Sequence, residues 1–445
     1  MRIVIVLLLL PYIITLSACR PSEPVPPATE ESADSPKPKA APVEVVPNVP
    51  AEPPPQEEPA APEEPAVPDE PAPQVEARMP DSRDAGLMLE KLGGTIGIDQ
   101  AGSVVRVDLS QTDASDADLA HLKGFPYLEQ LYLRGPAITN AGLVHLRELS
   151  RLKVLGLENT ATTDAGLAQL SGLTDLRALR LRRTDISDDG LPHLAPLTRL
   201  KELDIRFTNI TDDGMLHLAE MASLRNLKLQ ATQVTDFGLA HLTALKDLEQ
   251  LNLWGANFTD EALLHVKTFS KLRALELDDT EITDAGLEHL AGLTLLERLH
   301  LRRTFVGDEG LAHLAEMERM KTLLLRDTVV TDEGLAQLKR MTNLDTLDLS
   351  ETVIGNVGLE QLRPLKNLKR LNLWSSKVTT AGLAHLEGMT QLTWLNLENT
   401  QIDDAGLLHL EKLKTLTELH LNDTAVTDTG IEKLRQKVPG CRVVH

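Results

Sequence analysis

The sequence predicts an α/β fold, a right-handed solenoid of about fourteen 24-residue coils curved into a horseshoe. Parallel strands are expected on the concave face and short helices on the convex face. The main observation is a glycine that recurs every 24 residues without insertion or deletion, and a fixed period of this length is typical of solenoids. Asp118 and Ala262 take the two remaining places in the series. The glycines are Gly142, Gly166, Gly190, Gly214, Gly238, Gly286, Gly310, Gly334, Gly358, Gly382, Gly406 and Gly430.

The composition gives the second observation. Hydrophobic residues make up 42% of the 445-residue chain, but aromatic residues make up only 3%. A core built from this chain must therefore be filled by leucine and other aliphatic side chains, as in stacked repeats.

Each unit reads approximately LxxLxLxxTxITDxGLxHLxxL and predicts one strand and one helix. In the strand at 131–133, the two leucines point inward and Tyr132 points outward, because side chains alternate along a strand. The Thr-Asp pair at 163–164 is an N-cap signal for the helix that follows. Leucines at three-residue spacing then form one apolar stripe on that helix.

Both ends of the repeat array need covers, because no coil buries its leucines alone. Residues 81–103 predict an N-terminal cap made of a short helix, a Gly turn and a hairpin. The repeat domain then covers 104–445 and ends in a polar helix, IEKLRQKVPG, and a final strand, CRVVH.

The first residues predict export. Residues 1–18 combine Arg2 with a short apolar run and are expected to be a signal peptide. The LSAC string at 16–19 resembles a lipobox, which implies that Cys19 carries the lipid anchor. Only Cys19 and Cys441 are present, so no disulfide framework explains Cys19. The alternative is cleavage near Ala18, which would release a soluble protein.

Residues 19–80 predict a disordered stalk. From residue 20 to residue 80 there are 19 of the 26 prolines and no Leu, Ile or aromatic residue, so this segment cannot form a core. Thirteen acidic and four basic side chains give it a net charge of −9. Fully extended as polyproline II, it would span at most about 190 Å. A proline-rich ligand for an aromatic groove is the alternative, but the basic flank that such grooves read is missing.

The repeat phrase, as in ITDAGLEHL at 282–290, resembles the leucine-rich repeat of the ribonuclease-inhibitor-like superfamily. It is most similar to the cysteine-containing subclass found in F-box proteins. The resemblance covers residues 104–445 and implies a leucine-rich-repeat solenoid. Together with the lipobox-like LSAC string at 16–19, the chain resembles a bacterial leucine-rich-repeat lipoprotein. Threonine usually replaces cysteine at the ladder position, no F-box precedes the repeats, and export is predicted. A ubiquitin-ligase role is therefore not carried over.

Ten of the thirteen histidines fall in one column of the repeat. A ladder of imidazoles invites a metal hypothesis, but a position shared by many units is a property of the unit, so a structural role is expected and no metal site is predicted. If the rings stack closely, acid should charge them together near pH 5 to 6. The column is His121, His145, His193, His217, His241, His265, His289, His313, His385 and His409.

Candidate partner-binding residues lie at outward positions of the strands or just after them. Trp254 and Trp374 share one column and Trp394 lies in a neighbouring column, where large rings can anchor a protein or stack on a sugar. Two basic patches share the concave face, suited to carboxylate or phosphate groups of a partner; the alternative is an ordinary solvated face. The further candidates are Tyr132, Arg182, Arg206, Arg302 and Arg326, with Arg180, Arg298 and His300 beside them.

A longer period of 120 residues relates two halves of the array. The Arg-Arg-Thr triplets at 182–184 and 302–304 have this spacing, as do Trp254 and Trp374. This spacing indicates a duplication of five-coil blocks and predicts that the concave face meets its partner twice. Duplication without selection would give the same pattern.

These observations predict a non-catalytic binding protein of the cell envelope. No nucleophile with a nearby base and no phosphate-binding glycine loop is found, so neither catalytic residues nor a cofactor are expected. Removing the −9 of the stalk and the +1 of Arg2 from the total of −21 leaves −13 for residues 81–445, which disfavours nucleic acid as a partner. The expected partner is a protein; a polysaccharide-binding lipoprotein and a structural adhesin are the alternatives. The membrane is contacted only through the lipid, at the outer membrane or the outer face of the cytoplasmic membrane.

Overall fold

The computed structural model describes residues 81–255 and 257–445. The expected signal peptide, the lipid anchor at Cys19 and the proline-rich stalk lie outside the described residues. Within 81–445, no helix is long and apolar enough to cross a membrane.

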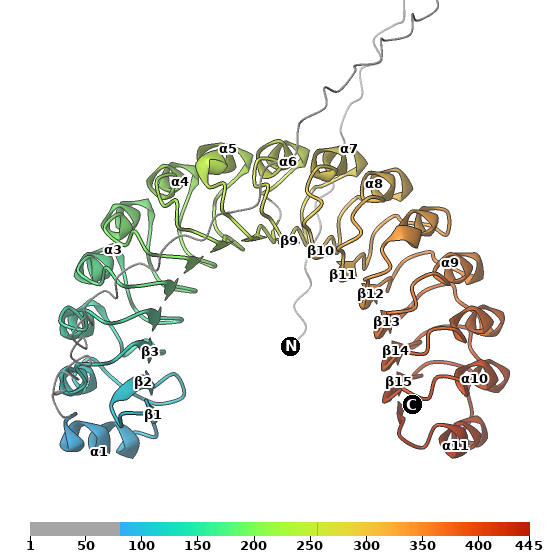
Figure 1. Cartoon of the computed structure of the whole chain (residues 1–445), viewed down its shortest axis with the longest axis horizontal. Helices are drawn as coiled ribbons and strands as arrows, with labels where there is room; N and C mark the ends of the chain where they lie inside the picture. The colour runs from blue at the N-terminus through green and yellow to red at the C-terminus, as the bar shows by residue number, and fades with distance from the viewer. Residues whose placement is uncertain (1–80, 256) are drawn as a thin grey trace, which may run out of the picture. The chain divides into compact units, whose positions relative to one another are not determined.

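The described residues form the predicted solenoid, with strands along the inner curve and helices along the outer curve (Figure 1). The sixteen strands belong to one sheet and follow one another in sequence order. The strands are β1 (Thr95–Ile98), β2 (Val104–Asp108), β3 (Gln130–Tyr132), β4 (Val154–Gly156), β5 (Ala178–Arg180), β6 (Glu202–Asp204), β7 (Asn226–Lys228), β8 (Gln250–Asn252), β9 (Ala274–Glu276), β10 (Arg298–His300), β11 (Thr322–Leu324), β12 (Thr346–Asp348), β13 (Arg370–Asn372), β14 (Trp394–Asn396), β15 (Glu418–His420) and β16 (Arg442–Val444).

The helices are short, and several coils have a 3₁₀ segment beside an α-helix or in its place. The α-helices are α1 (Arg83–Lys91), α2 (Asn140–Leu143), α3 (Asp164–Leu167), α4 (Asp212–Leu218), α5 (Asp236–His241), α6 (Asp260–Val266), α7 (Asp284–Leu287), α8 (Asp308–His313), α9 (Asn356–Gln361), α10 (Asp404–Leu410) and α11 (Asp428–Lys437). The 3₁₀ helices span Asp118–Gly124, Val144–Leu146, Ala168–Leu170, Asp188–Leu194, Leu242–Ala244, Glu288–Leu290, Gly334–Arg340 and Thr380–Leu386.

The register of the sheet follows the repeat. From β2 to β16 the strands are parallel, and each residue pairs with the residue 24 positions later, as Leu299 does with Leu323. Only β1 runs antiparallel, as the first strand of a hairpin with β2. Residues that share a position in the aligned repeats therefore lie side by side on adjacent strands, in columns that run across the concave face.

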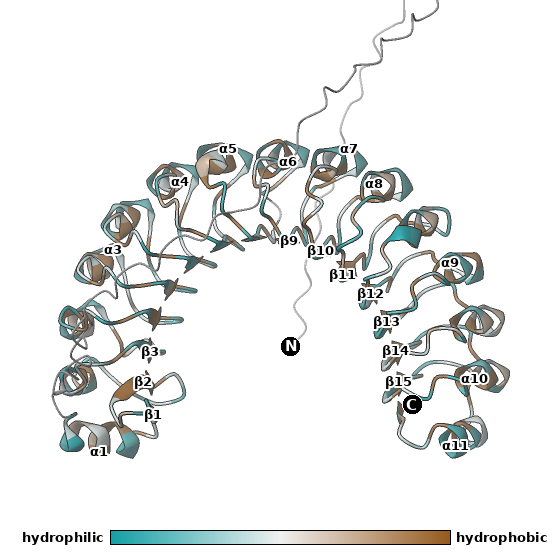
Figure 2. Cartoon of the chain, in the orientation of Figure 1, coloured by the Kyte–Doolittle hydropathy of each residue, from teal (hydrophilic) through white to brown (hydrophobic). Residues whose placement is uncertain are grey.

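Leucines from the strands and helices fill one continuous core. In the first complete coil, Leu131 of β3, Leu133 directly after it, and Leu143 and Leu146 of the helical side are fully buried. Figure 2 shows hydrophobic residues toward the interior of the coils and hydrophilic residues along the outside of the helices. The inward leucines and the outward Tyr132 predicted for the strand are confirmed, since Tyr132 stays partly exposed.

Both ends of the core are covered. Helix α1 buries Ala85 and Leu89 against the first coil, and the Asp81 carboxylate accepts a hydrogen bond from the backbone N–H of Val104 at 2.5 Å. At the other end, α11 and β16 close the array and bury Cys441, whose thiol pKa is raised by burial to about 11.

After each strand from β3 to β15, the chain turns through a residue with a positive φ. Eleven of the described residues other than glycine have φ between 51° and 59°, the left-handed conformation, among them Arg183 at 56° and Phe207 at 58°. This conformation disfavours side chains with a Cβ. Here the backbone N–H of Arg183 donates to the carbonyl of Arg206, and that of Phe207 donates to the carbonyl of Gln230, each at 3.0 Å. The turn therefore joins each coil to the next.

The buried threonine that follows the left-handed residue, at the position where the related repeats have cysteine, stabilises the same turn. The buried Thr184 hydroxyl donates to the Leu181 carbonyl at 2.6 Å, and Thr304 donates to Leu301 at 2.7 Å. A buried hydroxyl must be hydrogen-bonded to avoid the cost of desolvation, and this local bond meets the requirement in each such coil.

A second ladder links the helical sides of successive coils. The Asp188 carboxylate accepts hydrogen bonds from the Thr211 backbone N–H at 2.8 Å and from its hydroxyl at 2.6 Å. The same pair forms between Asp212 and Thr235 in the next coil. Thr211 also accepts from the backbone N–H of Asp213 as the predicted N-cap. At Thr211 the Thr-Asp phrase therefore caps its own helix and also bonds the neighbouring coils. Thr163 also lies at an N-cap position, but its side chain makes no cap hydrogen bond, so the prediction for that pair is confirmed only in position.

The recurring glycine is explained by this Asp–Thr ladder. A Cβ on Gly214 would overlap the Asp188 carboxylate and would lie 2.9 Å from Leu191 Cδ1 and 3.0 Å from Ile210 Cγ2. At Ala262, where a Cβ is present, the bond from Thr259 N–H to Asp236 is 3.0 Å. Glycine is therefore favoured at this point because adjacent coils approach closely, although Ala262 is accommodated with both Thr259–Asp236 hydrogen bonds kept.

We expect Gly214→Ala to lower the free energy of unfolding by about 1–3 kcal/mol, because the added methyl group forces two coils apart. Urea denaturation followed by circular dichroism measures the change. The matched control is Gly172→Ala, where a Cβ meets nothing within 4 Å, and it should change stability by less than about 0.5 kcal/mol. Equal effects of the two substitutions would contradict the steric explanation.

Candidate functional site

The concave face carries the candidate residues in three parallel columns. Tyr132 and His300 belong to the strand column, Trp394 lies two positions earlier in the repeat, and Trp254 and Trp374 lie two positions later. All of the partner-binding residues predicted from the sequence lie on this face, partly exposed. The structure therefore brings them onto one surface, in separate local environments along it.

The three tryptophans are held by their neighbours. The Trp254 indole N–H donates to Asp279 of the next coil. Arg326 lies over the Trp374 ring, 5.0 Å from its centroid. Trp394 has the Arg370 guanidinium 4.3 Å from its centroid and the His420 ring 5.4 Å away at a tilt of 53°. Each ring is thus half-buried between coils and presents only part of its surface.

Tyr132 belongs to a similar arrangement near the N-terminal end. Its ring has Arg106 at 4.6 Å and Arg180 at 5.9 Å from the centroid. Arg180 also forms an ion pair with Glu202 at 3.2 Å, from Nε to Oε1. These contacts hold the ring beside a hollow of about 250 Å³ lined by Ser110, Gln111, Tyr132, Arg134, Glu158, Asn159 and Arg182.

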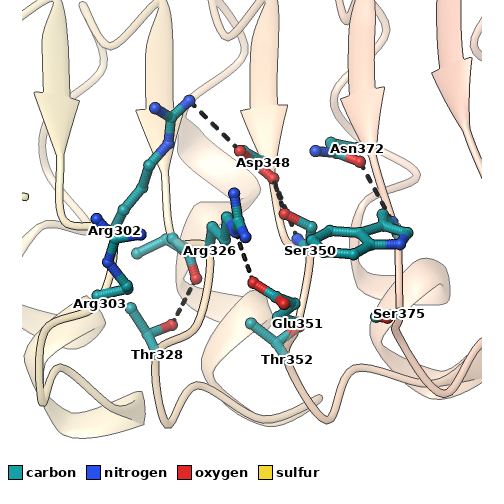
Figure 3. A network of polar contacts seen from close by, with 12 residues as sticks. Arg302, Arg303, Arg326, Thr328, Asp348, Ser350, Glu351, Thr352, Asn372 and Ser375 are labelled. Carbon is teal, nitrogen blue, oxygen red and sulfur yellow. Dashed lines mark hydrogen bonds and ion pairs between the residues drawn. The ribbon is translucent and has the colours of Figure 1, made fainter. Parts of the chain in front are cut away.

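The C-terminal arginine patch consists of Arg302, Arg303 and Arg326. Its arginines form ion pairs with carboxylates of other coils (Figure 3). Arg302 reaches Asp348 at 3.5 Å between Nη2 and Oδ2, and Arg326 reaches Glu351 at 2.6 Å between Nε and Oε2. Arg303 forms an ion pair with Asp279. Little positive charge therefore remains for a partner at Arg302 and Arg326.

The N-terminal arginine patch consists of Arg182, Arg183 and Arg206, and it differs in its ion pairs. Arg206 is paired with Asp204 at 2.6 Å, but among the described residues no carboxylate forms an ion pair with Arg182 or Arg183. Burial, together with the charges of Arg206 and Arg183, lowers the pKa of Arg182. Both unpaired guanidinium groups lie over the Phe207 ring, at 5.1 Å and 4.9 Å from its centroid. The two basic patches predicted from the sequence are thus unequal.

A buried acidic group lies between the two patches. Burial raises the pKa of Asp278 to about 6, although its carboxylate accepts a hydrogen bond from the Arg302 backbone N–H at 2.8 Å. Burial, with the charges of Arg302 and Arg298, also lowers the pKa of the neighbouring His300 to about 4. Asp279 behaves in the opposite way, since the hydrogen bond from Arg303 lowers its pKa.

The histidine column lies on the helical side and is partly or fully exposed. Within the described residues no two of these rings contact each other, so the close stacking on which the acid sensitivity depended is not found. His409 forms one hydrogen bond, from Nδ1 to Glu387 at 2.8 Å. No group of three or more metal-ligating side chains occurs between residues 81 and 445, leaving aside residue 256.

An exposed apolar strip lies away from the strands and was missed by the sequence reasoning. Phe305, Val329 and Val353 occupy one position in three successive coils and are 63%, 61% and 56% exposed. The signal was available in the sequence, because this position precedes the inward-facing Val or Ile of the TxITD phrase and is polar in most other units.

The buried Asp278 predicts a pH-dependent effect. Its folded-state pKa of about 6 lies above the usual value of 3.8, so the folded state loses stability as pH rises from about 4 to above 6. Asp278→Asn should therefore raise the melting temperature at pH 7.5 and have little effect near pH 4. The control Asp279→Asn should lower the melting temperature at pH 7.5. If both variants change the melting temperature at pH 7.5 in the same direction, the raised pKa of Asp278 is wrong as the explanation.

Comparisons with known proteins agree with the observed geometry. One leucine-rich-repeat family model matches residues 342–402, and a second leucine-rich-repeat model matches residues 197–219, 270–291 and 412–434. No curated protein matches the chain significantly.

Solved structures show the same fold. An internalin from Listeria monocytogenes is 23% identical, with a TM-score of 0.51, and the match covers 82% of this chain and 94% of the internalin. A leucine-rich-repeat protein from Leptospira interrogans is 17% identical, with a TM-score of 0.52, and the match covers 73% of this chain and 86% of that protein. The chain therefore contains leucine-rich repeats, and its described part has the fold of a leucine-rich-repeat solenoid.

Proposed function

We propose that this protein is a non-catalytic envelope lipoprotein that binds a protein partner through the concave face of its solenoid. The observation that carries the proposal is the concentration of Trp254, Trp374, Trp394, Tyr132 and the arginines on one continuous open face. Partly buried aromatic and arginine side chains are the residues that contribute most to protein interfaces. Parallel strands hold them at fixed spacing, so little ordering is needed on binding.

The place of action follows from the N-terminal sequence. Cys19 carries the lipid in this proposal, and the acidic, proline-rich residues 20–80 separate the solenoid from the membrane. Three acyl chains hold a protein on a bilayer without a spanning helix. The partner would then be another component of the envelope, reached from the outer membrane or from the outer face of the cytoplasmic membrane.

A polysaccharide partner is the second candidate. The hollow of about 220 Å³ beside Trp394 favours it, because polar side chains of Asp348, Arg370 and Asn372 also line that space. A sugar stacks on an open ring face, however, and Arg370 and His420 lie against the Trp394 ring. A protein partner, which can contact the edges of these rings, therefore has more support.

The first experiment is a pull-down from solubilised envelope with the full chain and with the triple variant Trp254→Ala, Trp374→Ala, Trp394→Ala. Loss of one defined protein from the eluate of the variant is expected, because three anchoring rings are removed. Truncation of a central interface residue costs about 2 kcal/mol or more of binding free energy.

The matched control is the triple variant Phe305→Ala, Val329→Ala, Val353→Ala, which removes exposed apolar side chains from another surface. Both variants should melt cooperatively. If the control loses the partner and the tryptophan variant keeps it, the concave face is not the binding surface. Retention of cell-wall or capsular polysaccharide alone would replace the protein partner by the second candidate.

A further inference from the structure

The duplicated arginine triplets have different surroundings, and this difference identifies a particular part of the concave face. Adding 120 to a residue number gives its counterpart in the second copy, so Arg182 and Arg183 correspond to Arg302 and Arg303. The second copy has three carboxylates that pair with its arginines: Asp279, Asp348 and Glu351. The counterparts of these carboxylates in the first copy are Asn159, Lys228 and Ala231.

Every acidic partner of the second copy is thus replaced by a residue without negative charge in the first copy. Arg206, the counterpart of Arg326, finds another carboxylate in Asp204. Arg182 and Arg183 form no ion pair with any carboxylate among the residues that the structure describes. Arg134, which lies two coils before Arg182 in the same column, forms none there either. Three guanidinium groups are therefore left available on one stretch of the face.

The site has further features that point to a ligand. The Nε of Arg182 is buried and has no hydrogen-bond acceptor among the described residues, and an unsatisfied buried donor is costly. The Nε of Arg302 is in the same state, so the two copies differ in their ion pairs and not in this donor. Arg134 and Arg182 line the hollow of about 250 Å³, together with the polar side chains of Ser110, Gln111 and Asn159. The Phe207 ring of the next coil has its centroid 5.1 Å and 4.9 Å from the guanidinium carbons of Arg182 and Arg183.

Glu158 is the one carboxylate lining this hollow, and it lies between Arg134 and Arg182 in the column. It forms no ion pair with either of them within the described part of the chain. Burial raises its pKa, against the opposing charges of Arg180 and Arg134. Glu158 would repel a second anionic group in the hollow, which disfavours a doubly charged phosphate more than a single carboxylate.

We propose that Arg134, Arg182 and Arg183 form the docking site for an acidic peptide segment of the protein partner, with one partner carboxylate bound in the hollow at Arg182. This inference rests on the proposed protein-binding function and specifies its site. A carboxylate fits the planar guanidinium fork. The net charge of −13 over residues 81–445 repels an acidic segment on average, which favours its binding at this local concentration of unpaired arginines.

The test measures binding of a fluorescently labelled peptide of alternating Glu and Ser to the full chain, by anisotropy at low salt, beside a Gln-Ser peptide. The Glu-Ser peptide should bind and the Gln-Ser peptide should not. Arg182→Gln with Arg183→Gln should weaken binding at least about tenfold, and raised salt should also weaken it. Glu158→Gln should strengthen binding, an effect that general damage to the fold would not produce.

The matched control is Arg302→Gln with Arg303→Gln, which removes the same charge from the self-neutralised copy and should change binding less than about twofold, as expected for charges already paired. Equal weakening by both double variants would mean that net charge governs binding, and would overturn the site. Failure of the parent to prefer the Glu-Ser peptide would also overturn it. So would selective binding of dextran sulfate or inorganic phosphate at Arg182 and Arg183 without the peptide.

The same variants separate this inference from the proposed function. If the Arg182 and Arg183 variant still captures the envelope protein that the tryptophan variant loses, the concave face binds a protein but not through these arginines. If no envelope protein is captured and the peptide still binds at Arg182, the acidic-peptide site stands without the proposed partner.

Discussion

The contact between the aspartate of one coil and the threonine of the next is the interaction on which the solenoid depends. A 24-residue coil cannot bury its leucines alone, so it is stable only when its neighbours stack at close range. The Asp188 carboxylate binds both the N–H and the hydroxyl of Thr211, which fixes the spacing on the helical side. The left-handed turns fix it on the strand side, where Arg183 N–H reaches the Arg206 carbonyl. Glycine is favoured where the aspartate crosses the next helix, and Ala262 is the one larger residue found there in the described coils from Gly142 onward.

This regular stacking also determines the chemistry of the concave face. Because each strand residue pairs with the residue 24 positions later, the electrostatic surroundings of a side chain are set by its neighbours in adjacent coils. Arg303 lies beside Asp279 and is neutralised, whereas Arg183 lies beside Asn159 and Phe207 and is not. Two copies of one triplet have therefore diverged into a closed ionic network and a basic site that is open to an acidic partner.

Much of the fold could be predicted because the spacing of leucines within each repeat shows which residues face the core. The inward leucines and the N-capping role of threonines such as Thr211 follow from local periodicity and propensity, and the structure confirms them. The second role of Thr211, as a donor to Asp188, could not be predicted, because the partner is in another coil at a distance that only stacking defines. The left-handed backbone conformation of Phe207 could not be predicted from the sequence either, since bulky residues rarely adopt it.

The candidate site was predicted less completely than the fold. The sequence by itself determined the period, the leucine core and the face on which Trp254, Trp374 and the arginines lie, because these follow from spacing along one chain. Only the tertiary structure decided which arginines are paired and which rings are covered, as Arg370 covers Trp394. The physical reason is that ion pairs and ring contacts act over a few ångströms between adjacent coils, where side-chain direction matters as much as sequence register.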